Sequence, residues 1–220
     1  MARLTASDFV AMARQALGGV DSGLISDARI LRLINMAQIE IAQLYTPSEL
    51  ETSTTISAVS GTAEYETTAT DILKVLTVVD STNYMELKEA DRSWYDRATQ
   101  GNPESGTPSR WFESGVGSNS RKQFTFWPTP DGSYTITITY TKMPTEVVTS
   151  PTATSSILNQ AWDDTIFHLA VARGWMWLGQ DRNYDMWKRE AQHFASLAFG
   201  STARSRYDPH EASSILSRKI

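Results

Sequence analysis

Apolar positions repeat with a helical period at both ends of the chain and with a strand period in its middle. Near the start, Thr5 and Asp8 have the spacing of a capping box, with Asp in place of Glu. Apolar residues then follow at helical spacing as far as Gly18-Gly19, a pair typical of a helix end. The first predicted element is therefore a short amphipathic helix.

A second helix is predicted from Arg29 to Tyr45, with Ser26 as its N-cap and Pro47 as the residue that ends it. Its expected apolar face recurs at helical spacing. The residues of that face are Ile30, Leu33, Ile34, Ala37, Ile41 and Leu44.

From about Glu51 the period changes to that of strands. Residues 52–58 and 62–68 are rich in Thr and β-branched residues, which favours strands. The run from Ile72 to Val79 is almost continuously apolar, so we expect a strand that is buried on both faces. Asn83 is the expected turn into a short strand, residues 84–87.

The clearest strand lies within Ser133 to Thr141, where Tyr and Ile alternate with Thr from Tyr134 onward. The segment from Trp127 to Gly132 precedes it and reads Trp-Pro-Thr-Pro-Asp-Gly, which we interpret as a hairpin turn. Two further strands are expected at residues 110–114 and 123–127, and a short helix at residues 89–98.

The last third of the chain is helical again. One predicted helix ends at Gly179, and the next begins at Asp181. The expected apolar face of the first consists of Trp162, Ile166, Leu169, Ala170, Arg173 and Trp177, and that of the second of Tyr184, Trp187, Ala191, Phe194 and Ala198.

These elements predict an α+β fold. The N- and C-terminal helices are expected to form one helical bundle, into which an antiparallel β-sandwich or barrel-like unit is inserted. The predicted domains are residues 1–50 (N-terminal helices), 51–148 (β domain), 149–200 (C-terminal helices) and 201–220 (an extended tail).

Composition narrows the class of protein. The 220 residues are 40% hydrophobic and 20% charged, as in globular proteins. No apolar run approaches the roughly 18 residues that span a membrane, and the N-terminus does not resemble a signal peptide. Cysteine is absent, so disulfides and thiolate sites are excluded. The net charge of −5 argues against a general nucleic-acid binder.

The residues give no positive support for catalysis, a metal site or a cofactor site. His168, His193 and His210 lack the spacing of a two-histidine metal site, and we interpret the first two as packing or surface residues. Asp163 and Asp164 are adjacent, so on a helix their side chains diverge and favour an interaction with the helix dipole instead.

The tail from Ser201 to Ile220 is polar and carries four cations, with an apolar last residue. It has no predicted partner in its own chain, which leaves two interpretations open. It is either a docking peptide that orders on another protein or a plainly disordered terminus.

In order and spacing, four segments resemble the head-to-tail adaptors of tailed phages, also called connectors or head-completion proteins, including the tail tubular protein A type. The segments are Ile30–Tyr45, Asp71–Val75, Gly106–Trp111 and Phe126–Pro144 followed by the two closing helices. The resemblance covers residues 4 to 199, and the tail beyond Phe199 matches nothing in it.

The resemblance implies a structural virion protein of the neck, without enzymatic activity or cofactors. Such adaptors form a ring, commonly of twelve copies, under the portal protein. The ring extends the DNA channel, helps to retain and deliver the genome, and contacts a distal tail or neck component. Double-stranded DNA would pass through the channel without sequence-specific binding. The protein would contact no membrane, and it would assemble in the host cytoplasm. We expect the tail to dock on the portal through Ile215, Leu216, Arg218, Lys219 and Ile220.

Three alternatives stay open from the sequence. The first is another tail-completion or tube protein of the virion. The second is a carbohydrate- or receptor-binding module, which predicts that Trp94, Trp111 and Trp127 line one open face. The third is a hydrolytic virion enzyme, which would need a clustered acid pair or a metal site.

Overall fold

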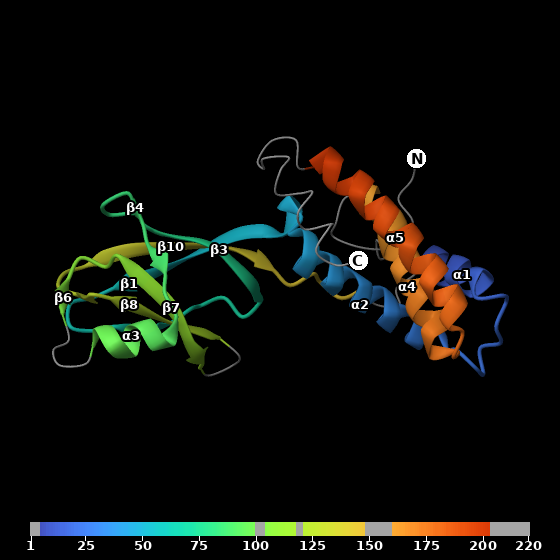
Figure 1. The fold of residues 1–220 in the computed structure, drawn as a ribbon, viewed down its shortest axis with the longest axis horizontal. Helices are drawn as coiled ribbons and strands as arrows, with labels where there is room; N and C mark the ends of the chain where they lie inside the picture. Colours follow the sequence, from blue (N-terminus) through green and yellow to red (C-terminus); the bar gives the residue numbers. More distant parts are fainter. Residues whose placement is uncertain (1–4, 100–103, 118–120, 148–159, 203–220) are drawn as a thin grey trace. The chain divides into compact units, whose positions relative to one another are not determined.

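The computed structural model describes residues 5–99, 104–117, 121–147 and 160–202, and it has the predicted α+β fold (Figure 1). The chain divides into two compact units. The first, the helical unit, combines Met1–Leu50 with Pro144–Ile220. The second, the β unit, is Glu51–Met143. Both chain ends thus contribute to one unit, and the strands of the other lie between them in sequence.

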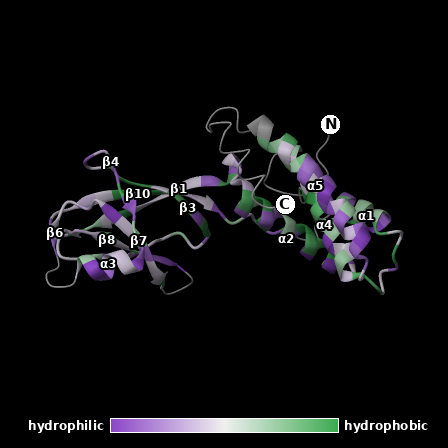
Figure 2. Ribbon diagram, in the orientation of Figure 1, coloured by the Kyte–Doolittle hydropathy of each residue, from purple (hydrophilic) through white to green (hydrophobic). Residues whose placement is uncertain are grey.

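Four α-helices build the described part of the helical unit. They are α1 (Ala6–Ala16), α2 (Asp27–Tyr45), α4 (Asp163–Trp177) and α5 (Asp181–Thr202), with short 3₁₀ turns at Ser48–Leu50 and Gln160–Trp162. Helix α4 packs against α1, α2 and α5, so it forms the centre of this unit. Figure 2 shows strongly hydrophobic bands on α2, in keeping with its buried face.

Local sequence signals determine where the first two helices begin. The Thr5 hydroxyl accepts a hydrogen bond from the Asp8 N–H at 3.2 Å, and the Asp8 carboxylate accepts one from the Thr5 N–H at 2.8 Å. This is the predicted capping box. The Ser26 hydroxyl accepts from the Arg29 N–H at 3.3 Å. Gly18 adopts a φ of 81° just after α1, where a residue with a Cβ would be strained.

The apolar faces predicted for α2 and α4 are confirmed in their central turns, and each is wrong near its C-terminal end. In α1, the apolar residue Met12 is exposed although it has the spacing of the buried face. Ile34 and Ile41 of α2 are fully buried, but Leu44 is exposed. Leu31 and Ala42 are buried instead, because α2 packs against both α1 and α4 and therefore buries a wider stripe than one helical row.

The returning chain is tied to α2 by one amide side chain. Asn35 Oδ1 accepts a hydrogen bond from the Val147 N–H at 2.8 Å, and Asn35 Nδ2 donates to the Val147 carbonyl at 3.2 Å. Val147 is buried, so both of its backbone polar groups need such partners. Asn35 therefore holds the segment that leaves the β unit in a fixed position on the helical unit.

Two sheets form the β unit. The first has the order β1 (Glu51–Ala58), β10 (Tyr134–Lys142), β3 (Ile72–Asp80), β4 (Met85–Glu86). The second has the order β2 (Glu64–Glu66), β8 (Lys122–Trp127), β7 (Arg110–Val116), β5 (Lys88–Glu89), and its outer face carries α3 (Arg92–Ala98). Neighbours are antiparallel except for β5 beside β7. A separate parallel pair joins β6 (Ser105–Gly106) to β9 (Thr129–Pro130).

The inner faces of the two sheets share one core, which makes the unit a sandwich. Alternation along β10 is confirmed, since Ile136, Ile138 and Tyr140 are buried. The Tyr140 hydroxyl donates to Asp71 at 3.2 Å, and burial together with the charge of that carboxylate raises the pKa of Tyr140. The prediction that the Ile72–Val79 strand is buried on both faces is wrong: Lys74 is exposed, because antiparallel sheets commonly have one solvated face.

The interpretation of Trp127–Gly132 as a hairpin turn is also wrong. The strands on either side of it, β8 and β10, belong to different sheets, and β10 pairs with β1 and β3. The segment instead crosses between the sheets and is fastened along its length. Thr129 N–H donates to the Glu104 carbonyl at 2.9 Å, and Gly61 N–H donates to the Pro130 carbonyl at 2.8 Å. Turn residues indicate that a strand ends, but they do not determine its partner.

A close approach between the end of α1 and α4 favours glycine at position 174. A Cβ on Gly174 would lie 2.9 Å from Leu17 Cδ2 and 3.0 Å from Leu17 Cδ1, closer than van der Waals contact. Leu17 is itself fully buried just after α1, so its side chain would have to shift within the packed interior.

We therefore predict that Gly174→Val lowers the free energy of unfolding by about 1–3 kcal/mol through overpacking. Urea unfolding followed by the far-ultraviolet circular dichroism of the helices measures this change. In the double variant Leu17→Ala/Gly174→Val, the valine should occupy part of the vacated volume. Its destabilisation should then be smaller than the sum of the two single effects. Additive effects would contradict the proposed contact.

Candidate interaction surfaces

The described parts of the chain bring no three potential metal ligands from His, Asp or Glu side chains together. Asp163 is buried at the start of α4 and its neighbour Asp164 is exposed, so the two carboxylates differ in environment. In the same residues, no helix has the length and hydropathy needed to cross a membrane.

His168 belongs to an aromatic cluster between α4 and α5. Its ring centroid lies 5.1 Å from that of Trp187 and 4.7 Å from that of Phe194. Its Nδ1 is 2.7 Å from the Asp164 carbonyl oxygen, one helical turn back. These contacts give His168 a packing role, as predicted. His193 is exposed on α5, and His210 lies outside the described residues.

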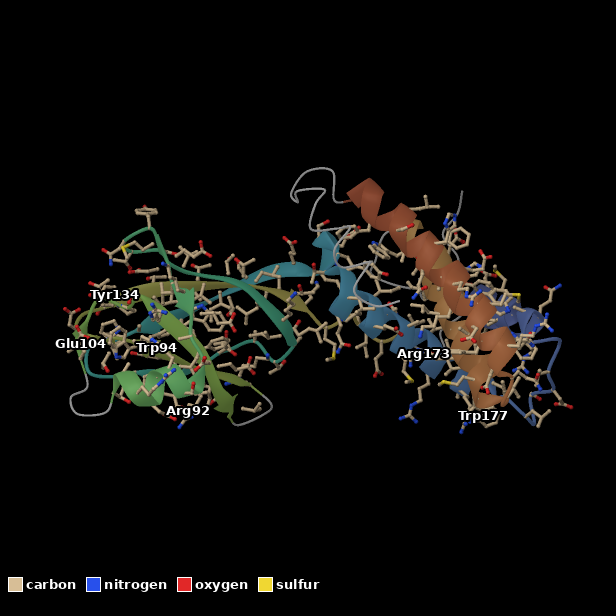
Figure 3. All side chains as sticks on the ribbon, viewed as in Figure 1. Arg92, Trp94, Glu104, Tyr134, Arg173 and Trp177 are labelled. Carbon is tan, nitrogen blue, oxygen red and sulfur yellow. The ribbon has the colours of Figure 1, made fainter. Side chains whose placement is uncertain are left out.

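The helical unit carries an exposed aromatic surface at the end of α4, which we call the Trp177 surface: Arg29, Met176 and Trp177. Met176 and Trp177 are exposed, and the Arg29 guanidinium lies 4.5 Å from the centroid of a Trp177 ring. One turn earlier on α4, Arg173 forms an ion pair with Glu40 of α2 at 2.5 Å (Figure 3). The assignment of Trp177 to the buried face was wrong, because α4 ends at this residue and its ring projects beside α2 instead of into the core.

In the β unit, the three tryptophans of the predicted sugar-binding face do not share a face. Trp111 is buried in the core of the sandwich, where its ring lies 5.6 Å from Phe124. Trp94 of α3 meets Trp127 edge-on at 5.0 Å, and the Arg110 guanidinium lies 4.5 Å from a Trp94 ring. These contacts attach α3 to the outer face of the second sheet. The prediction of an open platform of three aromatic rings is therefore wrong.

A further cluster holds the crossing segment described above. The Tyr134 hydroxyl donates to Asp131 Oδ1 at 2.5 Å and lies 3.3 Å from the Thr107 hydroxyl oxygen (Figure 3). The hydrogen bond to the Asp131 carboxylate raises the pKa of Tyr134, because loss of the phenolic proton would break that bond. The cluster thus has a structural role: it connects the crossing segment to the start of β10 and to Thr107.

The turn between β3 and β4 presents the most exposed aromatic side chain among the described residues. Tyr84 is 90% exposed and Met85 is 46% exposed. The sequence predicts the turn at Asn83, but the exposure of the two residues after it was not predicted. The available signal was a polar Asp-Ser-Thr-Asn sequence, typical of a hydrogen-bonded turn, placed directly before two large apolar residues.

The five proposed portal-docking residues lie outside the described part of the chain. These are Ile215, Leu216, Arg218, Lys219 and Ile220. Their role stays a prediction.

A helical unit made from both chain ends, with a β-sandwich inserted in sequence, is the architecture implied by the adaptor resemblance. The fold therefore defines an α+β protein built from these two units. The model of the SU10 adaptor protein family matches residues 4–215. The chain belongs to this family of phage head–tail adaptors, and a comparison with curated proteins gives no match.

Family membership makes the chain a structural adaptor of the virion neck that interacts with other head and tail components. The match also extends beyond Phe199, where the sequence resemblance ended, and includes much of the tail. Of the five docking residues, Ile215 is inside the matched range, and the other four follow it.

The Trp177 surface predicts a contrast between two tryptophans of the helical unit. Trp177→Ala should change the free energy of unfolding by about 1 kcal/mol or less, because its ring is 47% exposed and a cation–π contact at the surface contributes little. Trp162→Ala should cost about 3–5 kcal/mol, because that ring is fully buried. Urea denaturation of both variants measures the difference. Equal losses would show that Trp177 is part of the core.

Proposed function

We propose that this protein assembles as a ring of twelve copies beneath the portal of the filled capsid and joins the head to the tail. The ring extends the DNA channel and helps to retain and deliver the genome. The observation that carries this proposal is the adaptor family match over residues 4–215, almost the whole chain. The other partners are the portal protein and a distal tail or neck component.

The charge of the chain supports passage of DNA without binding. A net charge of −5 per copy gives a ring a strongly negative total charge, which repels phosphate groups. Proteins that bind DNA through its backbone instead require lysine and arginine clusters that release counterions. An acidic ring is therefore suited to a channel in which the DNA must not adhere during ejection.

The Trp177 surface supports contacts between copies. Exposed apolar side chains gain most when a partner removes them from water, and aromatic residues and arginine are enriched in interfaces. Arg29 and Trp177 already contact each other, so less side-chain freedom is lost when a neighbouring copy packs on them. We infer that this surface forms part of the contact between the helical units of neighbouring copies.

Negative-stain electron microscopy of the purified protein, alone and mixed with the portal protein, tests the function. We expect rings that lie coaxially on the portal, with or without rings of the protein alone. A monomer that persists at high concentration and ignores the portal would contradict the proposal.

The portal-docking role of the tail has its own test. Helix α5 extends to Thr202, so deletion of residues 203–220 leaves that helix complete. We predict that this deletion weakens portal binding by about tenfold or more, as expected for the loss of several anchoring residues. Replacing Ile215, Leu216 and Ile220 with Ser should have the same direction of effect. Reversing Arg218 and Lys219 to Glu shows whether charge contributes. Undiminished attachment of the deletion variant would refute the role.

A further inference from the structure

The β unit is one continuous stretch of chain that builds a core from its own strands. Phe124, Phe126, Ile136 and Ile138 are fully buried in this core, which joins β8 of the second sheet to β10 of the first. The stretch Glu51–Met143 also has the length of an ordinary small domain. The β unit therefore contains within one segment what its folding needs.

The two ends of the β unit lie next to each other. Antiparallel pairing places Glu51, the first residue of β1, opposite Thr141 near the end of β10. Cα atoms of paired residues in antiparallel strands lie about 4.5–5.5 Å apart. The Met143 N–H donates to the Asp71 carbonyl at 2.7 Å, which holds the last residue of the unit in place. The folded β unit thus brings together the points at which the chain enters and leaves it.

The helical unit, in contrast, is assembled from two separate segments. Helix α4 follows the β unit in sequence and packs against α1 and α2, which precede it. Ile34 and Ile41 of α2 and Ile166 and Val171 of α4 are fully buried, so each segment contributes to the core of this unit. Folding of the helical unit therefore requires the two segments to meet, and the β unit is the chain that connects them.

We propose that closure of the chain couples the folding of the two units, so that each stabilises the other with no contact between them required. While the β unit is folded, the two helical segments are joined through a connection of about four residues, at positions 144–147. When the β unit unfolds, that connection becomes a flexible loop of roughly 90 residues. Loop closure becomes less favourable with about the 3/2 power of loop length, so the folding equilibrium of the helical unit should fall about a hundredfold.

The coupling acts equally in the other direction. The folded helical unit holds the ends of the β unit together and restricts its unfolded chain, as a disulfide across the same loop would. Thermodynamic linkage makes the two factors equal, because both describe the same difference in free energy. A head or tail component that stabilises one unit therefore makes the other unit harder to unfold.

Flexible linkers in the connection test the coupling, because they lengthen it without changing either core. Thr145 and Glu146 are exposed, so Gly/Ser linkers of five and of twenty residues can be inserted between them. Amide hydrogen exchange, measured by mass spectrometry where exchange follows the opening equilibrium, reports the opening of each unit. We expect the slowest amides of β8, β10, α2 and α4 all to exchange about threefold faster with the shorter linker and about tenfold faster with the longer one.

The same linkers in the connection from β7 to β8, after Gly117, are the matched control. There they lengthen a loop inside the β unit, so exchange should become faster in β8 and β10 and stay unchanged in α2 and α4. The coupling is wrong if the linkers after Thr145 leave both units unchanged or affect one unit only. An effect that does not grow from five to twenty residues would also overturn it, because local damage at the insertion site does not depend on linker length.

Discussion

The fold depends on the return of the chain from the β unit to the helical unit. Asn35 binds both the N–H and the C=O of Val147, which lies 112 residues later in the sequence. Arg173 and Glu40 add an ion pair across 133 residues. Contacts of such separation form only after a large loop has closed, and the loop-closure entropy opposes them. A β unit that folds compactly within this loop brings its two ends together and reduces that cost.

The return of the chain constrains helix α4 most strongly. It must fit against α1 and α2, which precede the β unit, and also against α5. Gly174 allows the end of α1 to approach it closely, and Trp162 fills the space at its other end. The helical unit is therefore completed by the second half of the chain, and the first two helices alone would leave their apolar faces uncovered.

Much of this fold could be predicted from local patterns. The capping box at Thr5 and the alternation along β10 are properties of neighbouring residues, so the sequence displays them directly. The pairing partners of the strands could not be predicted in this way. The segment after Trp127 has the residues of a turn, yet it joins two sheets, because the choice of partner depends on packing across the whole sandwich. Leu44 and Trp177 were misassigned for the same reason: helical periodicity continues past the point where the neighbouring helices cease to cover it.

The candidate surfaces were the hardest part to predict, for a physical reason. A sequence pattern assigns large apolar residues to a core, and Tyr84 and Trp177 have the composition of core residues. They differ from core residues because the fold leaves their side chains exposed to solvent. At Tyr84 the backbone has an unfavourable φ of 56°, and the side chain is 90% exposed. A conformation that costs stability without benefit to the isolated molecule is understandable when the benefit arises in an assembly. Family membership as a head–tail adaptor supplies the assembly in which such a residue has a use.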